Sequence, residues 1–316
     1  TLLASSAASD VYKRQLFIVM MLGFLAVQCK IIKGESVQHF SKVVVNTVIP
    51  CAIFESFQIE YTSERLSGLL LAFGAALVVH VIFFALTWAI RKPLRLTAVE
   101  EASLICSNSG QLLFPLITAT LGAEWIFYAS AFMAIGTVVV WSMGISKISN
   151  AAQFQLKKLL CNMNILAIFV GVIVFLAGWD LPNIVDSAIT NVGSMIGPAC
   201  MLSIGMTIGS MKSFQRSQLW RVLMLSGWRL LIYPFACMIL FSSGWVLGLH
   251  PDTAKILLIT TLAAAAPSSA VIAQLAQIYD NAALWGSIIN VVTTLLCILT
   301  MPFITWLYQA MTHLQV

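Results

Sequence analysis

The chain has 316 residues, of which 60% are hydrophobic and 9% charged, and its formal net charge is +5. Soluble domains carry roughly 25% charged residues, so this composition excludes an ordinary water-soluble fold. It indicates an all-α integral membrane protein, because only helices and closed barrels satisfy their backbone in lipid. No metalloprotease, hydrolase or phosphate-loop motif occurs, so we expect no enzyme activity, no metal and no cofactor.

Residues 1–15 differ in composition from the rest of the chain, and we interpret them as a non-native leader. From residue 16 onward, apolar stretches alternate with charged or turn-rich breaks. About 20 apolar residues cross a bilayer as a helix. The stretches predict about ten transmembrane helices, at 16–28, 40–58, 66–90, 98–120, 124–146, 159–178, 185–208, 219–247, 254–277 and 283–309.

Basic residues gather in or beside alternate loops of this map, and such loops stay in the cytoplasm. With these loops in the cytoplasm, both termini lie outside. The same basic loops account for the net positive charge, so we expect no nucleic-acid partner. The loop 147–158 becomes a cytoplasmic linker between a first five-helix repeat, 16–146, and a second, 159–316. The basic residues concerned are Lys30, Lys33, Lys42, Arg91, Lys92, Arg95, Lys147, Lys157, Lys158, Lys212, Arg216 and Arg221.

The two halves are similar at an offset of about 150 residues. NTVIPCAIF at 46–54 recurs loosely as SMIGPACML at 194–202, and Pro115 in the fourth span matches Pro267 in the ninth. Because each half has an odd number of spans, the second half crosses the membrane in the opposite orientation to the first. The sequence therefore predicts inverted repeats with broken crossover helices 4 and 9, an architecture that places transporter substrates at the bilayer midplane.

Both crossover helices carry polar residues beside a proline, as CSNSGQLLFP at 106–115 and AAAAPSSAVIAQ at 263–274. Proline removes a backbone donor and glycine tolerates unwound geometry, so we expect each helix to break here. The exposed N-termini of half-helices favour anions. The alternative is a pair of proline kinks satisfied by neighbouring helices. The substrate-binding residues predicted at the breaks are Asn108, Ser109, Gly110, Gln111, Pro115, Pro267, Ser268 and Ser269.

Arg229 is a full charge near the middle of the eighth predicted span, which costs at least ~2.5–3.5 kcal/mol. We predict a role in substrate binding or coupling, with a structural link to backbone carbonyls as an equal alternative. His80 lies nearly in the corresponding place of the third span, and Glu55 near the outer end of the second. Both are coupling-ion candidates, although a neutral histidine with one hydrogen bond is the stronger interpretation of His80.

Gly193 and Gly197, like Gly205 and Gly209, have GxxxG spacing in the seventh span. This pattern favours close helix packing or dimerisation, and it leaves a homodimer open. Asn290 is a polar residue within a span, for which an interhelical hydrogen bond is the favoured role.

These features together resemble the auxin efflux carrier family, which includes plant auxin exporters and bacterial carriers of organic acids. The resemblance covers the chain from Gln15 onward and is most specific at the two proline segments. The residues that carry it are LGFLAVQCKIIKGE at 22–35, VNTVIPCAIF at 45–54, SNSGQLLFPL at 107–116, LSIGM at 202–206 and the stretch 263–308, which begins AAAAPSSAVIAQ.

The resemblance implies a scaffold domain and a moving transport domain, in which spans three and eight accompany the crossing helices. It places Asn108 on the family's substrate-contacting asparagine, and Pro115 and Pro267 on the crossover prolines. Leu113 stands where the family often has glycine, so the identity of the substrate is not carried over. The short central loop resembles bacterial members, which favours a bacterial inner membrane.

The sequence thus predicts a secondary carrier in the lipid bilayer that moves a small organic anion, such as a mono- or dicarboxylate, by alternating access. Coupling to H⁺ or Na⁺ stays open. A channel and a membrane-embedded sensor are the alternatives, and an intramembrane enzyme is a more distant one because Ser268 and Ser269 have no histidine nearby in sequence.

Overall fold

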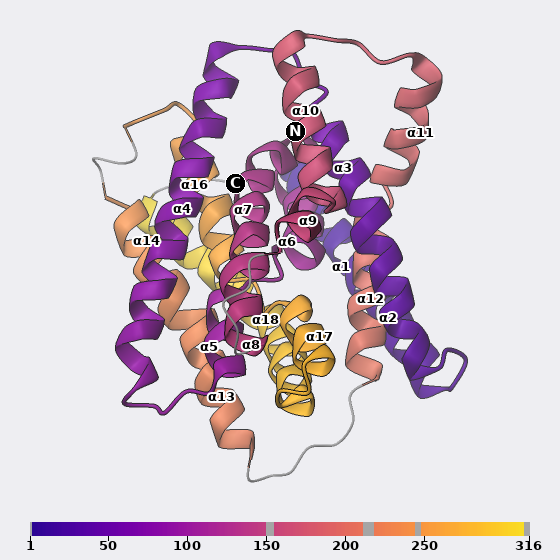
Figure 1. Ribbon diagram of the computed structural model, residues 1–316. Coiled ribbons are helices and arrows are strands. Elements are labelled where there is room, and N and C mark those ends of the chain that lie inside the picture. Colours follow the sequence, from indigo (N-terminus) through magenta and orange to yellow (C-terminus); the bar gives the residue numbers. More distant parts are fainter. Residues whose placement is uncertain (1, 150–154, 211–217, 244–247, 313–316) are drawn as a thin grey trace. The chain divides into compact units, whose positions relative to one another are not determined.

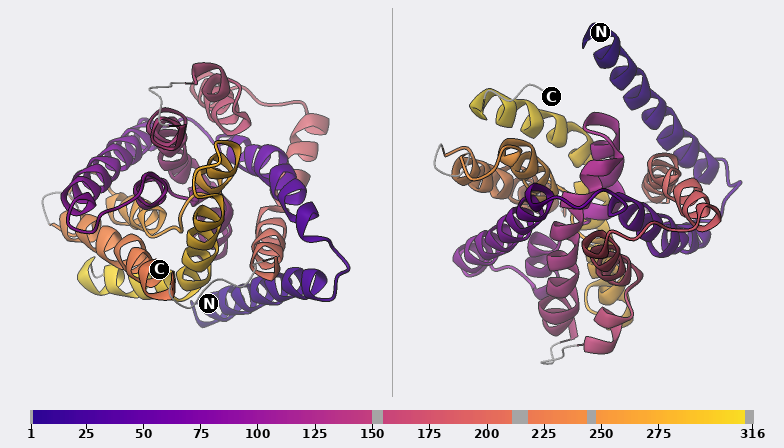
Figure 2. Two further views of the ribbon diagram at one scale, coloured as in Figure 1. Left: turned by 60° about the horizontal axis from the view of Figure 1, so that its bottom comes forward. Right: turned by 90° about the horizontal axis from the view of Figure 1, so that it is seen from above.

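The structure is a computed structural model, and its described elements are helices (Figure 1). It describes residues 2–149, 155–210, 218–243 and 248–312, and their side chains except those of 2–14, 35 and 283. Two further views show the same helical elements and the short loops between many of them (Figure 2). Within the described residues, extended backbone pairs at one place, an isolated antiparallel bridge between Ser107 and Ser268.

The chain divides into two compact units, which are described separately below. Unit 1 comprises Thr1–Tyr61, Gly110–Ser130 and Asn162–Lys212, and unit 2 comprises Thr62–Ser109, Ala131–Cys161 and Ser213–Val316. Two helices contribute residues to both units. They are α6 (Ser109–Thr120) and α7 (Ile126–Val139), joined by the short 3-10 helix η2 (Ala123–Trp125).

In unit 1, a nearly continuous rod is formed by α2 (Gly34–Val43), the π-helical segment η1 (Val44–Val48) and α3 (Ile49–Ser56). The π segment precedes Pro50, which has no N–H to donate to the carbonyl four residues earlier, so the helix widens there. The other helices of the unit are α1 (Leu2–Gln28), α10 (Met163–Ala177), α11 (Asn183–Gly193) and α12 (Ile196–Gly209).

Glycines let α1 and α12 approach closely in unit 1. A Cβ on Gly205 would overlap the carbonyl oxygen of Met20, and one on Gly209 would meet that of Phe24. Gly193 packs in the same way against Ala52 of α3. The GxxxG spacing is therefore used for close packing within the chain, and the predicted homodimer stays a prediction.

In unit 2, α4 (Ser63–Arg91) starts at Thr62, whose hydroxyl accepts from Arg65 N, and α5 (Ala98–Ile105) starts with a capping box of Thr97 and Glu100. A second π segment, η5 (Trp228–Ile232), precedes Pro234 between α13 (Leu219–Gly227) and α14 (Tyr233–Phe241). The remaining elements are η3 (Val140–Gly144), α8 (Ile145–Ser149), α9 (Leu156–Leu160), α16 (Thr253–Ala264), α17 (Ala270–Ile278) and α18 (Ala283–Thr312).

Six stretches of the described chain are long and apolar enough to cross a membrane, at Ser36–Ser56, Ser63–Arg91, Ala123–Ser149, Asn183–Gly209, Leu219–Phe241 and Leu284–Thr312. They correspond to the second, third, fifth, seventh, eighth and tenth predicted spans. Shorter apolar helices cover Gln15–Gln28, Met163–Ala177 and Thr253–Ala264. The multi-pass membrane character is confirmed, whereas ten spans and an inverted repeat stay predictions.

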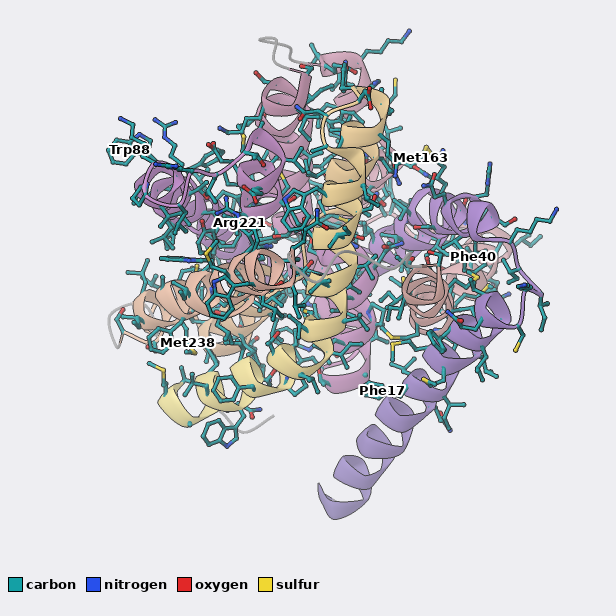
Figure 3. All side chains as sticks on the ribbon, turned by 90° about the horizontal axis from the view of Figure 1, so that it is seen from below. Phe17, Phe40, Trp88, Met163, Arg221 and Met238 are labelled. Carbon is teal, nitrogen blue, oxygen red and sulfur yellow. The ribbon has the colours of Figure 1, made fainter. Side chains whose placement is uncertain are left out.

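Apolar side chains also cover outward surfaces, as a lipid environment requires. Trp88 on α4 is 68% exposed and points away from its helix (Figure 3). Phe17 on α1 and Phe303 on α18 are likewise exposed. A helix of a water-soluble protein would not need such a surface, so these residues agree with the composition.

Helix α1 begins at Leu2, before the predicted span 16–28, and its apolar part is Gln15–Gln28. Helix α8 runs to Ser149, into the predicted linker 147–158. Three predicted features lie partly outside the described residues. They are the cytoplasmic loops at Lys212 and Arg216, the linker at 150–154 and the eighth span at 244–247.

Candidate functional site

The two predicted helix breaks pair with each other in unit 2. Between α5 and α6 the chain is extended at 106–108, and between α16 and α17 it is non-helical at 265–269. Asn108 N donates to Pro267 O at 2.9 Å, and Ser269 N donates to Cys106 O at 2.9 Å. Each break thereby satisfies backbone groups of the other, which is how non-helical backbone is tolerated at membrane depth.

The two prolines do not hold equivalent places. Pro267 lies in the second break, as predicted, directly before Ser268. Pro115 lies inside α6 instead, so the first break is on the N-terminal side of Ser109 and not at this proline. The first break therefore lies within the predicted stretch 106–115, at its N-terminal end, where it pairs with the second break.

Helix α18 supports the second break through three side chains. Thr293 Oγ1 accepts from Ser268 N at 3.1 Å, and Asn290 Nδ2 donates to Ser268 O at 2.7 Å. Cys297 Sγ donates to Ala265 O at 3.3 Å. Asn290 thus makes the interhelical hydrogen bond predicted for it, and the backbone around Ser268 is held on both sides.

Arg229 reaches both breaks from η5. It is 1% exposed, its Nη1 donates to Ala264 O at 2.9 Å at the end of α16, and its Nη2 donates to Ser107 Oγ. The guanidinium also stacks over the ring of Phe83, with 4.8 Å between its carbon and the ring centroid. No carboxylate of the described residues pairs with it. A buried cation therefore lies beside the bridge, and the described residues give it only neutral hydrogen-bond partners.

The break residues differ in exposure and in role. Ser107 and Asn108 are half-buried, whereas Pro267, Ser268 and Ser269 are buried. Ser269 caps α17, since its hydroxyl accepts from Val271 N at 3.3 Å. Ser107 and Asn108 therefore offer the accessible polar surface of the crossing.

The predicted residues after Ser109 belong to unit 1. Gly110 is buried in the first turn of α6, and Gln111 Nε2 donates to Ser41 Oγ at 2.8 Å. Glu55 of α3 lies close to Gly193 and hydrogen-bonds with Thr190. Within unit 1 both polar side chains thus have protein partners, and the predicted roles of Gln111 and Glu55 stay predictions.

His80 is buried in α4 of unit 2, among Phe83 and Phe132. Its Nδ1 lies 2.8 Å from Ala76 O, and because a carbonyl only accepts, Nδ1 carries the proton. Nε2 has no hydrogen-bond partner among the described residues. This is the geometry expected of a neutral histidine with one hydrogen bond, and no set of metal ligands forms around it or elsewhere in the described chain.

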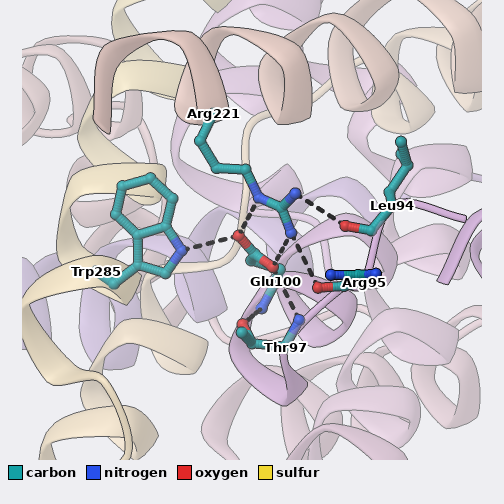
Figure 4. A network of polar contacts seen from close by, with 6 residues as sticks. All are labelled: Leu94, Arg95, Thr97, Glu100, Arg221 and Trp285. Atoms are coloured by element: carbon teal, nitrogen blue, oxygen red, sulfur yellow. Dashed lines mark hydrogen bonds and ion pairs between the residues drawn. The ribbon is translucent and has the colours of Figure 1, made fainter. Parts of the chain in front are cut away.

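A second polar cluster, at the start of α5, anchors the half-helix (Figure 4). Arg221 donates Nε to Glu100 Oε1 and Nη2 to Oε2, both at 2.8 Å, and Trp285 Nε1 donates to Oε1 at 3.1 Å. Arg221 also donates to the carbonyls of Leu94 and Arg95. Glu101 pairs with Lys147. Helix α5 is thereby fixed at the end opposite to the bridge.

Sequence reasoning missed two residues of the crossing. Ser107 was noted only as part of a polar motif, and Thr293 was not singled out at all. A signal for Ser107 existed in its place within the motif, directly before Asn108. Thr293 gave none, because a threonine in an apolar helix ordinarily bonds to its own helix, as Thr293 also does with Ile289 O.

Comparison with known proteins identifies the class of protein. No curated protein matches the chain. A family model described as membrane transport protein matches residues 14–153 and 147–305, which is nearly the whole chain. With its apolar helices and its paired helix breaks, the chain belongs to this membrane transport protein family, that of the auxin efflux carriers.

Proposed function

We propose that the protein is a secondary carrier that moves a small organic anion, such as a mono- or dicarboxylate, across the membrane by alternating access. Membership of the transport family supports the carrier class. The substrate class and the mechanism are our inference from the crossing in unit 2, and the following observations support them.

The observation that carries the proposal is the uncompensated charge of Arg229. A guanidinium in a membrane interior is costly unless it faces a cavity or a counter-charge. Here its bonds go to a carbonyl and a hydroxyl, and the described residues supply no carboxylate for it. The half-buried Asn108 and Ser107 lie on the same crossing. An anion bound there would neutralise the charge.

The helix termini favour the same sign of charge. Helices α6 and α17 both begin directly after the bridged segments, so their N-terminal N–H groups add positive potential there. Asn108 and Ser109 would bind the anion from one break, and Pro267 to Ser269 would shape the other. An arginine and helix dipoles together favour a carboxylate over a cation or a neutral solute.

Alternating access would be a movement of unit 2, which carries the crossing, relative to unit 1. The division of the chain into two compact units supports this scheme. We place both termini outside a bacterial inner membrane, following the basic loops. Export of one negative charge at −100 mV gains about 2.3 kcal/mol and needs no coupled ion. Uptake would need H⁺ or Na⁺, and His80 and Glu55 are the proton candidates.

The test is flux of labelled mono- and dicarboxylates into proteoliposomes with a set membrane potential. We expect saturable, voltage-dependent flux that is lost in Asn108→Ala and reduced in Arg229→Gln. Lys255→Gln removes an exposed cation of the same unit and should leave the flux unchanged. Absence of flux for every carboxylate would contradict the substrate class, and flux that never saturates would indicate a channel.

A further inference from the structure

The bridge places two serine hydroxyls side by side. Its hydrogen bonds run from Asn108 N to Pro267 O and from Ser269 N to Cys106 O, so they flank the pair Ser107 and Ser268 without joining it. Residues opposite each other in such a non-hydrogen-bonded antiparallel pair are the closer kind, and their side chains lie on the same face. Ser107 and Ser268 therefore project together.

Arg229 determines whether the hydroxyl of Ser107 donates or accepts a hydrogen bond with a ligand. A hydroxyl has one proton to donate and two lone pairs to accept with. Arg229 Nη2 donates to Ser107 Oγ, so the oxygen is the acceptor and the proton of Ser107 remains for another partner. The half-buried position of Ser107 leaves that proton within reach of a bound molecule. The arginine makes this serine a donor.

Ser268 is the second donor. It is 1% exposed, and its Oγ has no hydrogen-bond partner among the described residues. Its backbone N–H and carbonyl are both engaged, by Thr293 and Asn290, so the backbone that carries the hydroxyl is held in place. Buried hydroxyls without partners are costly. The hydroxyl of Ser268 differs from the other partnerless ones of the described chain, those of Ser103, Thr118, Ser203 and Thr300, because it lies opposite Ser107, which Arg229 contacts.

We propose that the hydroxyls of Ser107 and Ser268 donate together to one carboxylate of the substrate, and that Arg229 acts through Ser107 as a positioning residue. This inference rests on the proposed function and adds to it the donors that select a charged carboxylate. Hydrogen bonds from hydroxyls to a carboxylate are short and about twice as strong as neutral ones. The pair therefore discriminates against the uncharged amide of the same acid.

The first experiment measures transport of a carboxylate and of its amide analogue in proteoliposomes. Ser107→Ala and Ser268→Ala should each raise the KM for the carboxylate by about tenfold or more, the size expected for losing a hydrogen bond to a charged group. The amide should change little. Ser107→Thr keeps a hydroxyl and should restore most of the selectivity. Ser103→Ala, a buried serine of the same half-helix, is the matched control.

A double-mutant cycle then tests the role of Arg229. If Arg229 acts through Ser107, the loss of carboxylate selectivity in Ser107→Ala and in Arg229→Gln will not add in the double variant. Full additivity would overturn the positioning role. Each variant is first checked for an unchanged elution profile in detergent, and Arg229→Lys, which keeps the charge but loses the planar fork, serves where Arg229→Gln does not fold.

The outcomes separate this inference from the proposed function. Carboxylate flux through the unmodified protein with equal selectivity in Ser107→Ala and Ser268→Ala overturns the hydroxyl pair and leaves the organic-anion carrier intact. No carboxylate flux through the unmodified protein overturns both.

Discussion

Gly205 decides at the level of one residue how closely α1 and α12 approach. A methyl group there would overlap the carbonyl oxygen of Met20, which is backbone and cannot rotate away. The spacing of Gly205 and Gly209 predicted close packing from the sequence, but not the partner helix. Close packing and dimerisation use the same small residues, so only the structure assigns the contact to α1.

We expect Gly205→Ala to destabilise the protein by about 1–3 kcal/mol, because inserting a carbon into a tight helix contact forces the backbones apart. Thermal unfolding in detergent measures the change. Gly74→Ala is the control, since a Cβ at Gly74 of α4 meets no atom within 4 Å. That control should be neutral or stabilising by up to about 1 kcal/mol, as alanine favours a helix. A Tm of Gly205→Ala equal to that of the unmodified protein would contradict the assigned packing.

At the level of elements, the broken helices depend on α18. Ser268 N would have no helical acceptor in the break, and Thr293 supplies one. The sequence predicted that the fourth and ninth spans break, because prolines, glycine and polar side chains are local features. It did not predict where within 106–115 the first break lies, and there the chain pairs with a segment far along the sequence.

Thr293→Val should cost about 1–3 kcal/mol, because it leaves the buried N–H of Ser268 without an acceptor while keeping the side-chain shape. Thr260→Val is the matched control, a buried threonine of α16 that hydrogen-bonds only to Ile256 O of its own helix. We expect the control to change stability much less. Equal losses in chemical denaturation of the two variants would argue against the support from α18.

The anchor of α5 gives a second prediction at this level. Glu100→Gln removes the charge that receives two bonds from Arg221 and one from Trp285, and should lower stability by about 1.5–3 kcal/mol, the value of a hydrogen bond to a charged group. The side chain of Glu100 is 3% exposed, whereas that of Asp252 is 38% exposed in its pair with Lys255.

Asp252→Asn is therefore the control for Glu100→Gln, and its expected loss is below about 1 kcal/mol, as for exposed ion pairs. Unfolding of both variants in the same detergent measures the difference. A smaller loss in Glu100→Gln than in Asp252→Asn would show that the anchor does not hold the half-helix.

For the whole molecule, the basic loops predict the orientation in the membrane. Cys29 and Cys161 are exposed, and both stand beside loops that we place in the cytoplasm. We expect a membrane-impermeant maleimide to label them in inside-out vesicles and not in intact cells. The double variant Cys29→Ser with Cys161→Ser should lose this labelling. Labelling in intact cells would reverse the predicted orientation.

The sequence by itself determined the membrane class, the family and the polar segments at which helices break. Each of these follows from local features: apolar length, composition and short motifs. The tertiary structure decided that Ser107 faces Ser268, that Thr293 and Asn290 hold the second break, and that Arg229 reaches Ser107. These partners come from segments separated by other helices, and helical periodicity does not encode which buried polar groups meet. The need to satisfy buried backbone and charge selects them only when the chain is folded.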